Sequence, residues 1–212
     1  MLKAIIYDFD GVICNSVNIK TEAFADMYKS YGNTVVHKVI AYHQANGGIS
    51  RFEKFKYYHK ILLGHEKELT EAELTDLGNQ FSSIALKRVI NANYIPGAEV
   101  FLNQMSNKYQ QFICTGTPDD EIRIILQKRK LMKYFTNIYG SPCTKTTILQ
   151  KIKKKYKLES SEMLFLGDAM TDYYAAKAEN VRFIGVASIN TNFPDGITII
   201  NNFNDSKLQS IL

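Results

Sequence analysis

Cysteines, long apolar runs and a large excess of one charge are all scarce in this chain of 212 residues. The three cysteines, Cys14, Cys114 and Cys143, lack the paired spacing of a metal site or a disulfide framework, which favours a reducing compartment. Every apolar run is shorter than a membrane span, and Asp8 interrupts the first run before it reaches the length of a secretory signal. We therefore expect a soluble, cytoplasmic protein without a membrane partner.

The charges are nearly balanced, with a formal net charge of +5. Much of the excess comes from lysines that recur along one predicted helix and are typical of a solvated face: Lys151, Lys153, Lys154, Lys155 and Lys157. No DNA- or RNA-binding motif accompanies them, so we expect no nucleic-acid partner. A small anionic metabolite is compatible with the same modest charge.

The chain is long enough for one domain with a large core, or for a core domain that carries a smaller inserted one. An apolar run from Ala4 predicts a short buried strand at the start. Residues 16–92 then show almost only helical periodicity. Helices are predicted over 17–31, 35–42, 50–63 and 70–90, and the last opens with the capping pattern Thr70-Glu71-Ala72-Glu73.

From Tyr94 onward, short apolar runs alternate with helical patterns. Strands are predicted at 111–114, 137–140, 163–166, 182–186 and 197–200, with helices at 97–107, 118–130, 146–157 and 171–179. This alternation is typical of a parallel sheet covered by helices on both faces. We therefore predict an α/β protein with a Rossmann-like core of residues 1–15 and 93–212. A helical-bundle cap of residues 16–92 is inserted after the first strand.

Asp8 and Asp10 stand one residue apart at the end of the first predicted strand, and Gly11 permits the backbone to turn after them. Two crowded carboxylates repel each other, and a hard divalent cation such as Mg²⁺ relieves that repulsion. A solvated Asp-x-Asp-Gly turn that closes a strand is the alternative interpretation.

Ligands of an open parallel sheet bind beyond the carboxyl ends of its strands. Polar residues occur at that place after three other predicted strands: Thr115-Gly116-Thr117, Lys145, and Gly167-Asp168 with Asp172. We expect these segments to meet Asp8 and Asp10 at one edge of the sheet.

Taken together, these segments resemble the four motifs of the haloacid dehalogenase superfamily, in the branch of phosphoglycolate phosphatases and β-phosphoglucomutases with a helical cap. The resemblance covers essentially the whole chain, including the position of the cap between the first two motifs. It implies a Mg²⁺-dependent phosphatase that hydrolyses a small phosphomonoester, a phosphorylated sugar or hydroxy acid, through an aspartyl-phosphate intermediate. One departure is Asn15-Ser16, which stands where family members often carry Asp-Ser.

On this resemblance, Asp8 is the nucleophile, and Asp10 protonates the leaving oxygen and later deprotonates the hydrolytic water. The expected Mg²⁺ ligands are a carboxylate oxygen of Asp8, the backbone carbonyl of Asp10 and a carboxylate oxygen of Asp168. Asp172 is expected to support these ligands from a second layer or to pair with Lys145. For Asp168 and Asp172, a pair of helix-capping carboxylates is the alternative.

Three more residues are expected at the transferring phosphate. The hydroxyl of Thr115 and the backbone N–H of Gly116 suit a phosphoryl oxygen, although a polar strand-to-helix turn would use the same residues. Lys145 is expected to neutralise the phosphate and the Asp8 carboxylate.

The cap is expected to supply substrate specificity. Gly47-Gly48 interrupts the helical pattern, and Arg51 follows in the first turn of the next helix, where a flexible loop could present it to a second anionic group of the substrate. Lys54 is a weaker candidate, and a solvated arginine at a helix start is the alternative. The histidines of the cap are expected to be structural: His37, His43, His59 and His65. We also expect at least one thiol to border the mouth of the site.

Two other functions stay open. A β-phosphoglucomutase-like enzyme would return the phosphoryl group to a sugar, and a regulatory protein could keep the fold without catalysis. A monomer and a homodimer are both compatible with the sequence, which does not indicate the substrate.

Overall fold

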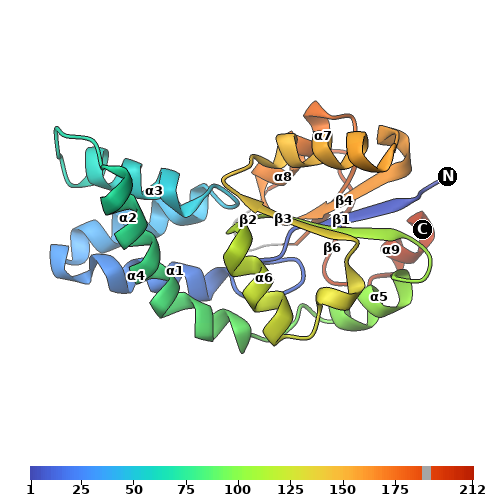
Figure 1. Ribbon diagram of the computed structural model, residues 1–212, viewed down its shortest axis with the longest axis horizontal. Coiled ribbons are helices and arrows are strands. Elements are labelled where there is room, and N and C mark those ends of the chain that lie inside the picture. Colours follow the sequence, from blue (N-terminus) through green and yellow to red (C-terminus); the bar gives the residue numbers. More distant parts are fainter. Residues whose placement is uncertain (188–191) are drawn as a thin grey trace.

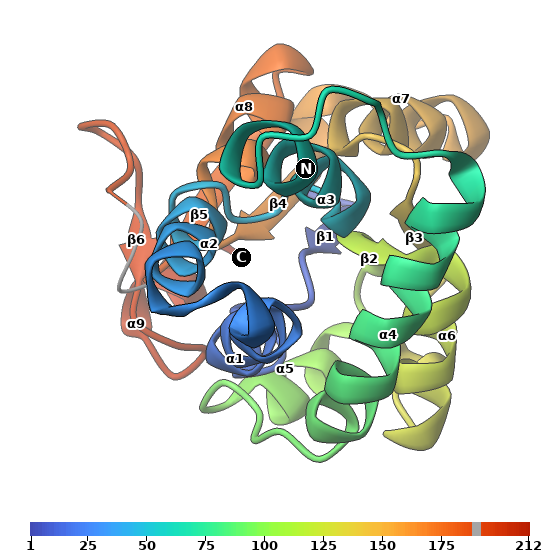
Figure 2. The same cartoon turned by 90° about the vertical axis from the view of Figure 1, so that its left-hand side faces the viewer.

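The computed structural model describes residues 1–187 and 192–212. In these residues the strands form one parallel sheet in the order β3-β2-β1-β4-β5-β6 (Figure 2). Their bounds are β1 Ala4–Tyr7, β2 Gln110–Pro118, β3 Asn137–Ser141, β4 Met163–Gly167, β5 Arg182–Val186 and β6 Ile199–Ile200. The predicted α/β class with a parallel sheet is confirmed.

Helices cover both faces of the sheet, with α7 and α8 on one side and α5, α6 and α9 on the other (Figure 1). The strand β1 shows why: Ile5 and Tyr7 belong to one buried cluster, whereas Ala4 and Ile6 belong to the other, as the two-residue period of a strand requires. The bounds of these helices are α5 Ala98–Met105, α6 Asp119–Lys128, α7 Lys145–Tyr156, α8 Met170–Ala178 and α9 Ser206–Ile211.

The segment between β1 and α5 is helical and lies beyond one end of the sheet (Figure 1). It contains α1 Val17–Tyr28, α2 Asn33–Ala45, α3 Arg51–Tyr57 and α4 Glu71–Ile90, with a short π-helical turn at Tyr58–Leu62. Its own core is aromatic, and Phe24 packs on Phe55, Tyr58 and Phe81 with ring centroids 4.4 to 5.8 Å apart. The predicted helical cap between the first and second strands is therefore confirmed.

Two short segments connect this helical region to the sheet, and they run antiparallel to each other. The backbone N–H of Asn15 donates to the carbonyl of Asn93 at 2.9 Å, and that of Ile95 donates to the carbonyl of Ile13 at 3.0 Å. The paired segments lie at the predicted boundaries after residue 15 and before residue 93. We keep residues 1–15 with 93–212 and residues 16–92 as the proposed domains.

Several element bounds differ from the predictions. The strand β2 extends to Pro118 instead of ending at Cys114, because β3 pairs with it past an irregularity in register between these two residues. The Thr-Gly-Thr-Pro stretch suggests a turn when the neighbouring strand is unknown.

The helices also differ in places from the predictions. The helix α2 runs from Asn33 to Ala45 instead of covering residues 35–42, and α9 was not predicted. The capping box of Thr70 and Glu73 at the start of α4 is confirmed. No helix in the described residues is both long and apolar enough to span a membrane.

Candidate active site

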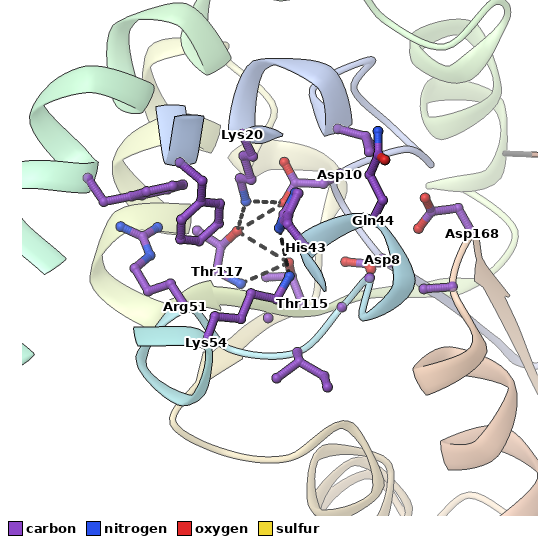
Figure 3. Close-up of a pocket in the computed structure, with 18 residues that line it drawn as sticks. Asp8, Asp10, Lys20, His43, Gln44, Arg51, Lys54, Thr115, Thr117 and Asp168 are labelled. Atoms are coloured by element: carbon purple, nitrogen blue, oxygen red, sulfur yellow. Dashed lines mark hydrogen bonds and ion pairs between the residues drawn. The ribbon is translucent and has the colours of Figure 1, made fainter. Parts of the chain in front are cut away.

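The carboxyl ends of the central strands bring the predicted residues together. Tyr7 of β1 pairs with Ile113 of β2 and with Leu166 of β4, so Asp8 leaves the sheet between these two neighbours. A cavity of about 80 Å³ opens there between the sheet edge and the helical region (Figure 3). Its lining includes six of the predicted site residues: Asp8, Asp10, Arg51, Thr115, Gly116 and Asp168.

Lys145 forms a buried ion pair with the carboxylate of Asp8. Its Nζ atom lies 2.6 Å from Oδ2 of Asp8 and also pairs with Oδ1 of Asp172. The remaining oxygen of Asp8 accepts a 2.6 Å hydrogen bond from the backbone N–H of Phe9. Burial opposes the charge of Lys145, but the charges of Asp172 and Asp8 outweigh burial and raise the pKa of the ammonium group. Lys145 therefore stays charged at neutral pH, and Asp172 adopts one of its two expected arrangements.

Three buried carboxyl groups form a cluster that suits a divalent cation. One carboxylate oxygen from each of Asp8, Asp168 and Asp172 lies within 4.8 Å of the others. Burial and the charges of Asp8 and Asp172 raise the pKa of Asp168 well above its ordinary value. Burial and Asp8 likewise raise the pKa of Asp172 to about 7, despite the opposing charge of Lys145. A hard cation would relieve this repulsion, and oxygen is the ligand that Mg²⁺ prefers.

Gly11 allows this cluster to pack closely. Its φ angle is +77°, and a β-carbon at this position would overlap the carboxylate of Asp168. The glycine after the two aspartates therefore provides both the turn and the room for Asp168.

Asp10 lies in the same cavity but in a different environment. Its carboxylate forms an ion pair and a hydrogen bond with Nζ of Lys20 and accepts a hydrogen bond from Thr117 Oγ1 at 3.1 Å (Figure 3). Ser16 Oγ donates a third hydrogen bond to it at 2.6 Å. Burial acts to raise the pKa of Asp10, but the charge of Lys20 and these three hydrogen bonds together lower it. The second aspartate is thus held as a carboxylate, away from the cluster of Asp8 and Asp168.

Lys20 and Thr117 are site residues that the sequence reasoning did not assign. Nζ of Lys20 lies 2.8 Å from Oγ1 of Thr117, and both side chains contact Asp10. Lys20 stands in the first turn of α1, the helix that directly follows the Asp10 loop. The position of Lys20 in the sequence, ten residues after Asp10, could have indicated that the two charges meet. Ser16 belongs to the Asn15-Ser16 pair that departs from the family pattern, yet its hydroxyl contacts Asp10.

The Thr115-Gly116 segment faces a loop from the helical region. A β-carbon on Gly116 would lie 2.7 Å from the carbonyl oxygen of Gly48, and the hydroxyl of Thr115 accepts a 3.2 Å hydrogen bond from the backbone N–H of Thr117. Gly48 itself, at φ +75°, leaves room for Thr171 and for Nζ of Lys145. The Gly47-Gly48 loop therefore closes over residues from three of the four predicted motifs.

Arg51 lies in the first turn of its helix as predicted, but its guanidinium is buried and already paired. It is the first residue of α3 and only 6% exposed, and its guanidinium pairs with Glu121 of α6 at 2.7 Å and with Ser82 of α4 at 2.8 Å. This ion pair joins the helical region to the sheet domain. Arg51 also lines the cavity, but its charge is already balanced by Glu121.

Lys54 and His43 form a buried pair on the cavity wall. Nζ of Lys54 lies 2.8 Å from Nδ1 of His43, and both residues line the cavity (Figure 3). Burial, together with the nearby charge of Lys20, lowers the pKa of Lys54 to about 7. Burial and the adjacent ammonium group lower the pKa of His43 to about 2. The imidazole is therefore neutral, and His43 is a cavity residue as well as a structural one.

The expected thiol at the mouth of the site is not found. None of the three cysteines is among the described residues that line the cavity. Cys14 and Cys114 are fully buried, and burial raises the pKa of Cys14 to about 12. Cys143 is partly exposed, and its sulfur lies 2.9 Å from Nζ of Lys151. Cys14 and Cys114 instead pack in the two buried apolar clusters on either face of the sheet.

A parallel sheet with an inserted helical cap, three charged motifs and a Thr-Gly-Thr motif at its edge is the arrangement of one hydrolase fold family. Residues 5–186 match the model of the haloacid dehalogenase-like hydrolases, and the chain belongs to this family. The Putative phosphatase YhcW of Bacillus subtilis (strain 168) is 28% identical over 103 residues, which are 49% of this chain and 43% of that protein. The match thus spans less than half of that relative's length.

Two solved structures illustrate the similarity in fold. A β-phosphoglucomutase from Clostridium difficile superimposes with a TM-score of 0.78 at 19% identity, covering 100% of this chain and 96% of that one. A predicted phosphoglycolate phosphatase from Haemophilus somnus 129PT gives a TM-score of 0.75 at 20% identity, covering 99% and 98%. Both comparisons support a shared architecture over the whole chain, including the helical region between β1 and β2.

Proposed function

We propose that the protein is a Mg²⁺-dependent phosphatase that hydrolyses a small phosphomonoester, a phosphorylated sugar or hydroxy acid, through an aspartyl phosphate on Asp8. The main support is that two aspartates of one motif reach one cavity in two separate environments. Asp8 is held by Lys145 beside the carboxylate cluster, whereas Asp10 is held by Lys20 and Thr117. Two carboxylates in different surroundings suit two different chemical roles.

In the first step, a carboxylate oxygen of Asp8 attacks the phosphorus atom, and the bond between phosphorus and the ester oxygen breaks. Asp10, a carboxylate in the free site, takes up a proton as the negatively charged substrate binds and gives that proton to the leaving oxygen, so an alcohol departs. Lys145 fixes the orientation of Asp8 and faces the negative charge of the transferring group. The Thr115 hydroxyl and the Gly116 N–H are the proposed contacts of the phosphoryl oxygens.

In the second step, the Asp10 carboxylate accepts a proton from a water molecule as the water oxygen attacks phosphorus. The bond between phosphorus and Asp8 breaks, which restores the Asp8 carboxylate and releases inorganic phosphate. The hydrogen bonds from Ser16 and Thr117 keep Asp10 in one orientation for both proton transfers.

The residues proposed to hold Mg²⁺ are Asp8, Asp168 and the backbone carbonyl of Asp10, with Asp172 supporting them. When bound, the cation supplies positive charge that draws the phosphate toward Asp8 and stabilises the charge that develops during transfer.

We place the enzyme in the cytoplasm, because its three cysteines are free. We take its ligand to be a phosphorylated metabolite, because lysine and arginine side chains line its small cavity. A monomer or a homodimer fits this role.

A screen of phosphorylated metabolites with Mg²⁺, with released phosphate as the readout, tests the proposal. Asp8→Asn and Asp10→Asn are expected to lower phosphate release at least about 1,000-fold, a loss typical of residues that perform the chemistry. Asp76→Asn is the matched control, because Asp76 is exposed on α4. Full activity of Asp8→Asn on a good substrate would disprove the proposed nucleophile.

The screen also separates hydrolysis from phosphoryl transfer within a sugar. A phosphomutase would convert one sugar phosphate into its isomer without net phosphate release. Isomer formation, measured by chromatography of the products, would replace the phosphatase proposal. Isolated aspartyl phosphate on Asp8 would be common to both reactions.

A further inference from the structure

Lys54 is the cavity cation that the protein itself leaves without a carboxylate. The other cationic groups at the site are paired: Lys20 with Asp10, Arg51 with Glu121, and Lys145 with Asp8 and Asp172. In the part of the chain that the structure describes, no carboxylate forms a salt bridge with Lys54, and its polar partner is Nδ1 of His43. The residue is nevertheless only 2% exposed.

His43 orients this ammonium group without neutralising it. A charged lysine has donors and no acceptor, so Nδ1 of His43 must accept and Nε2 must carry the ring proton. A neutral imidazole contributes one hydrogen bond, whereas a buried positive charge needs a counter-charge to offset its desolvation. Among the described residues the charge of Asp10 attracts Lys54, but that carboxylate is already paired with Lys20, so an anionic ligand in the cavity is the remaining source of a full counter-charge.

The pair belongs to the helical region and faces the cavity that Asp8 also lines. Lys54 comes from α3 and His43 from α2 (Figure 3). The ring of Phe24 packs on His43 with centroids 4.8 Å apart. A phosphoryl group at Asp8 and Thr115 leaves the rest of a substrate between the sheet edge and this wall. The group that meets Lys54 is therefore part of the leaving alcohol.

The charges and the room available favour a carboxylate over a second phosphate. Lys54 offers one positive charge, and the guanidinium of Arg51 is already bound to Glu121 and Ser82. One carboxylate balances one ammonium, whereas a phosphate dianion would keep an excess negative charge in a buried site. The enclosed part of the cavity is about 80 Å³, which suits a short-chain acid.

We propose that Lys54, oriented by His43, binds a carboxylate on the leaving group, so that the preferred substrate is a small phosphorylated hydroxy acid. This inference rests on the proposed phosphatase function, since it concerns the same cavity. It narrows the substrate class from phosphorylated sugars or acids to acids, and it assigns specificity to Lys54 instead of Arg51.

Binding of two matched ligands tests the inference. 2-Phosphoglycolate and 2-hydroxyethyl phosphate share the phosphate and the two-carbon chain but differ in having a carboxylate or a hydroxymethyl group. Isothermal titration calorimetry uses the Asp10→Asn chain with Mg²⁺, in which turnover is blocked. We expect the acid to bind at least 10-fold more tightly than the alcohol. Equal affinities would overturn the inference without any Lys54 variant.

Substitutions assign that preference to Lys54. In the same background, Lys54→Met is expected to weaken the acid at least 10-fold and the alcohol less than 3-fold, because it removes the charge and keeps the side-chain length. Lys56→Met is the control, since Lys56 lies exposed on the same helix and pairs with Glu53. Equal losses for both ligands would indicate a structural role and overturn the inference. Near-UV circular dichroism checks folding, and Lys54→Gln replaces Lys54→Met if that chain is unfolded.

The outcome is separate from that of the phosphatase proposal. Phosphate release by the wild-type chain without a preference for the acid would overturn the role of Lys54 and leave the phosphatase intact. A carboxylate preference in calorimetry that Lys54→Met abolishes would support the role of Lys54, even if no phosphomonoester were hydrolysed.

Discussion

Nζ of Lys145 lies 2.6 Å from Oδ2 of Asp8, although 137 residues separate them in the chain. The same ammonium group pairs with Asp172, so one buried cation faces two buried carboxylates. The contact orients the proposed nucleophile and offsets part of the negative charge that Asp8, Asp168 and Asp172 concentrate in one place.

The first prediction concerns this contact. Lys145→Met should lower kcat/KM for phosphate release at least about 100-fold, the usual effect of removing one group that stabilises developing charge. The melting temperature should also fall, because the carboxylates lose their cation. Lys154→Met, on the exposed side of the same helix, should change neither value. Wild-type turnover by Lys145→Met would refute the role.

The second prediction concerns the cation. Mg²⁺ should raise the melting temperature of the wild-type protein, because an ion that binds only the folded state stabilises it. The shift should grow as the pH rises through about 7, the raised pKa of Asp172, because Mg²⁺ binds the deprotonated carboxylates, and the raised pKa of Asp168 acts in the same direction. Asp168→Asn should reduce the shift, and EDTA should abolish phosphate release. An unchanged Mg²⁺ shift in Asp168→Asn, measured by differential scanning fluorimetry, would contradict the assignment.

The third prediction uses the pH dependence of Asp10. Lys20 lowers the pKa of this carboxyl group, and without it burial would raise the pKa. An acid that must be protonated in the first step loses activity as the pH rises through its pKa, so a higher pKa moves that loss to higher pH. Lys20→Met should therefore shift the descending limb of kcat/KM upward by roughly one to three pH units. An unchanged descending limb in the pH profile of kcat/KM would show that Lys20 does not set the pKa of Asp10.

The fourth prediction concerns the ion pair between Arg51 and Glu121. Burial acts to raise the pKa of Glu121, but its hydrogen bond and charge interaction with Arg51 outweigh burial and lower the pKa below the ordinary 4.5. A lowered pKa in the folded state gives stability that is present above pH 4.5 and lost as the pH falls through the folded-state pKa. At pH 7, Glu121→Gln should lose roughly 1.5–3 kcal/mol of unfolding free energy.

The difference between the two proteins should shrink below pH 4.5, where Glu121 of the wild type becomes protonated. Urea unfolding at pH 7, 4.5 and 3, followed by circular dichroism, measures it. Asp76→Asn serves as the exposed carboxylate control. A difference that is constant across this range would exclude the ion pair as its cause.

The fifth prediction compares two glycines with the same backbone conformation. Gly48 and Gly64 have φ angles of +75° and +73°, but a β-carbon would meet Thr171 and Lys145 at Gly48 and open space at Gly64. Each alanine substitution should lower the unfolding free energy by about 1 kcal/mol, the cost of a left-handed alanine. Gly48→Ala alone should also lower kcat/KM, by about 10- to 100-fold, because the loop must move away from Lys145. Equal kinetics for the two variants would mean that this contact is unimportant.

Local patterns were enough to predict the parallel sheet, the helical insertion and the motifs at the strand ends. The period of apolar residues in β1 and the Asp-x-Asp-Gly turn depend on neighbours in the chain, and the carboxyl ends of parallel strands must share one edge. For the same reason Asp8, Thr115 and Asp168 were predicted to meet, and they line one cavity.

The packing of the helical region against the sheet decided the rest. Lys20 and Thr117 are 97 residues apart, and Arg51 and Glu121 are 70 apart, so no local period records that these side chains meet. The pairing of Arg51 with Glu121, and of Lys54 with His43, follows from which helix faces turn toward the cavity. Local sequence patterns therefore located the sheet edge at which we propose phosphoryl transfer, whereas tertiary contacts decided that Lys54 pairs with His43 and not, among the described residues, with a carboxylate.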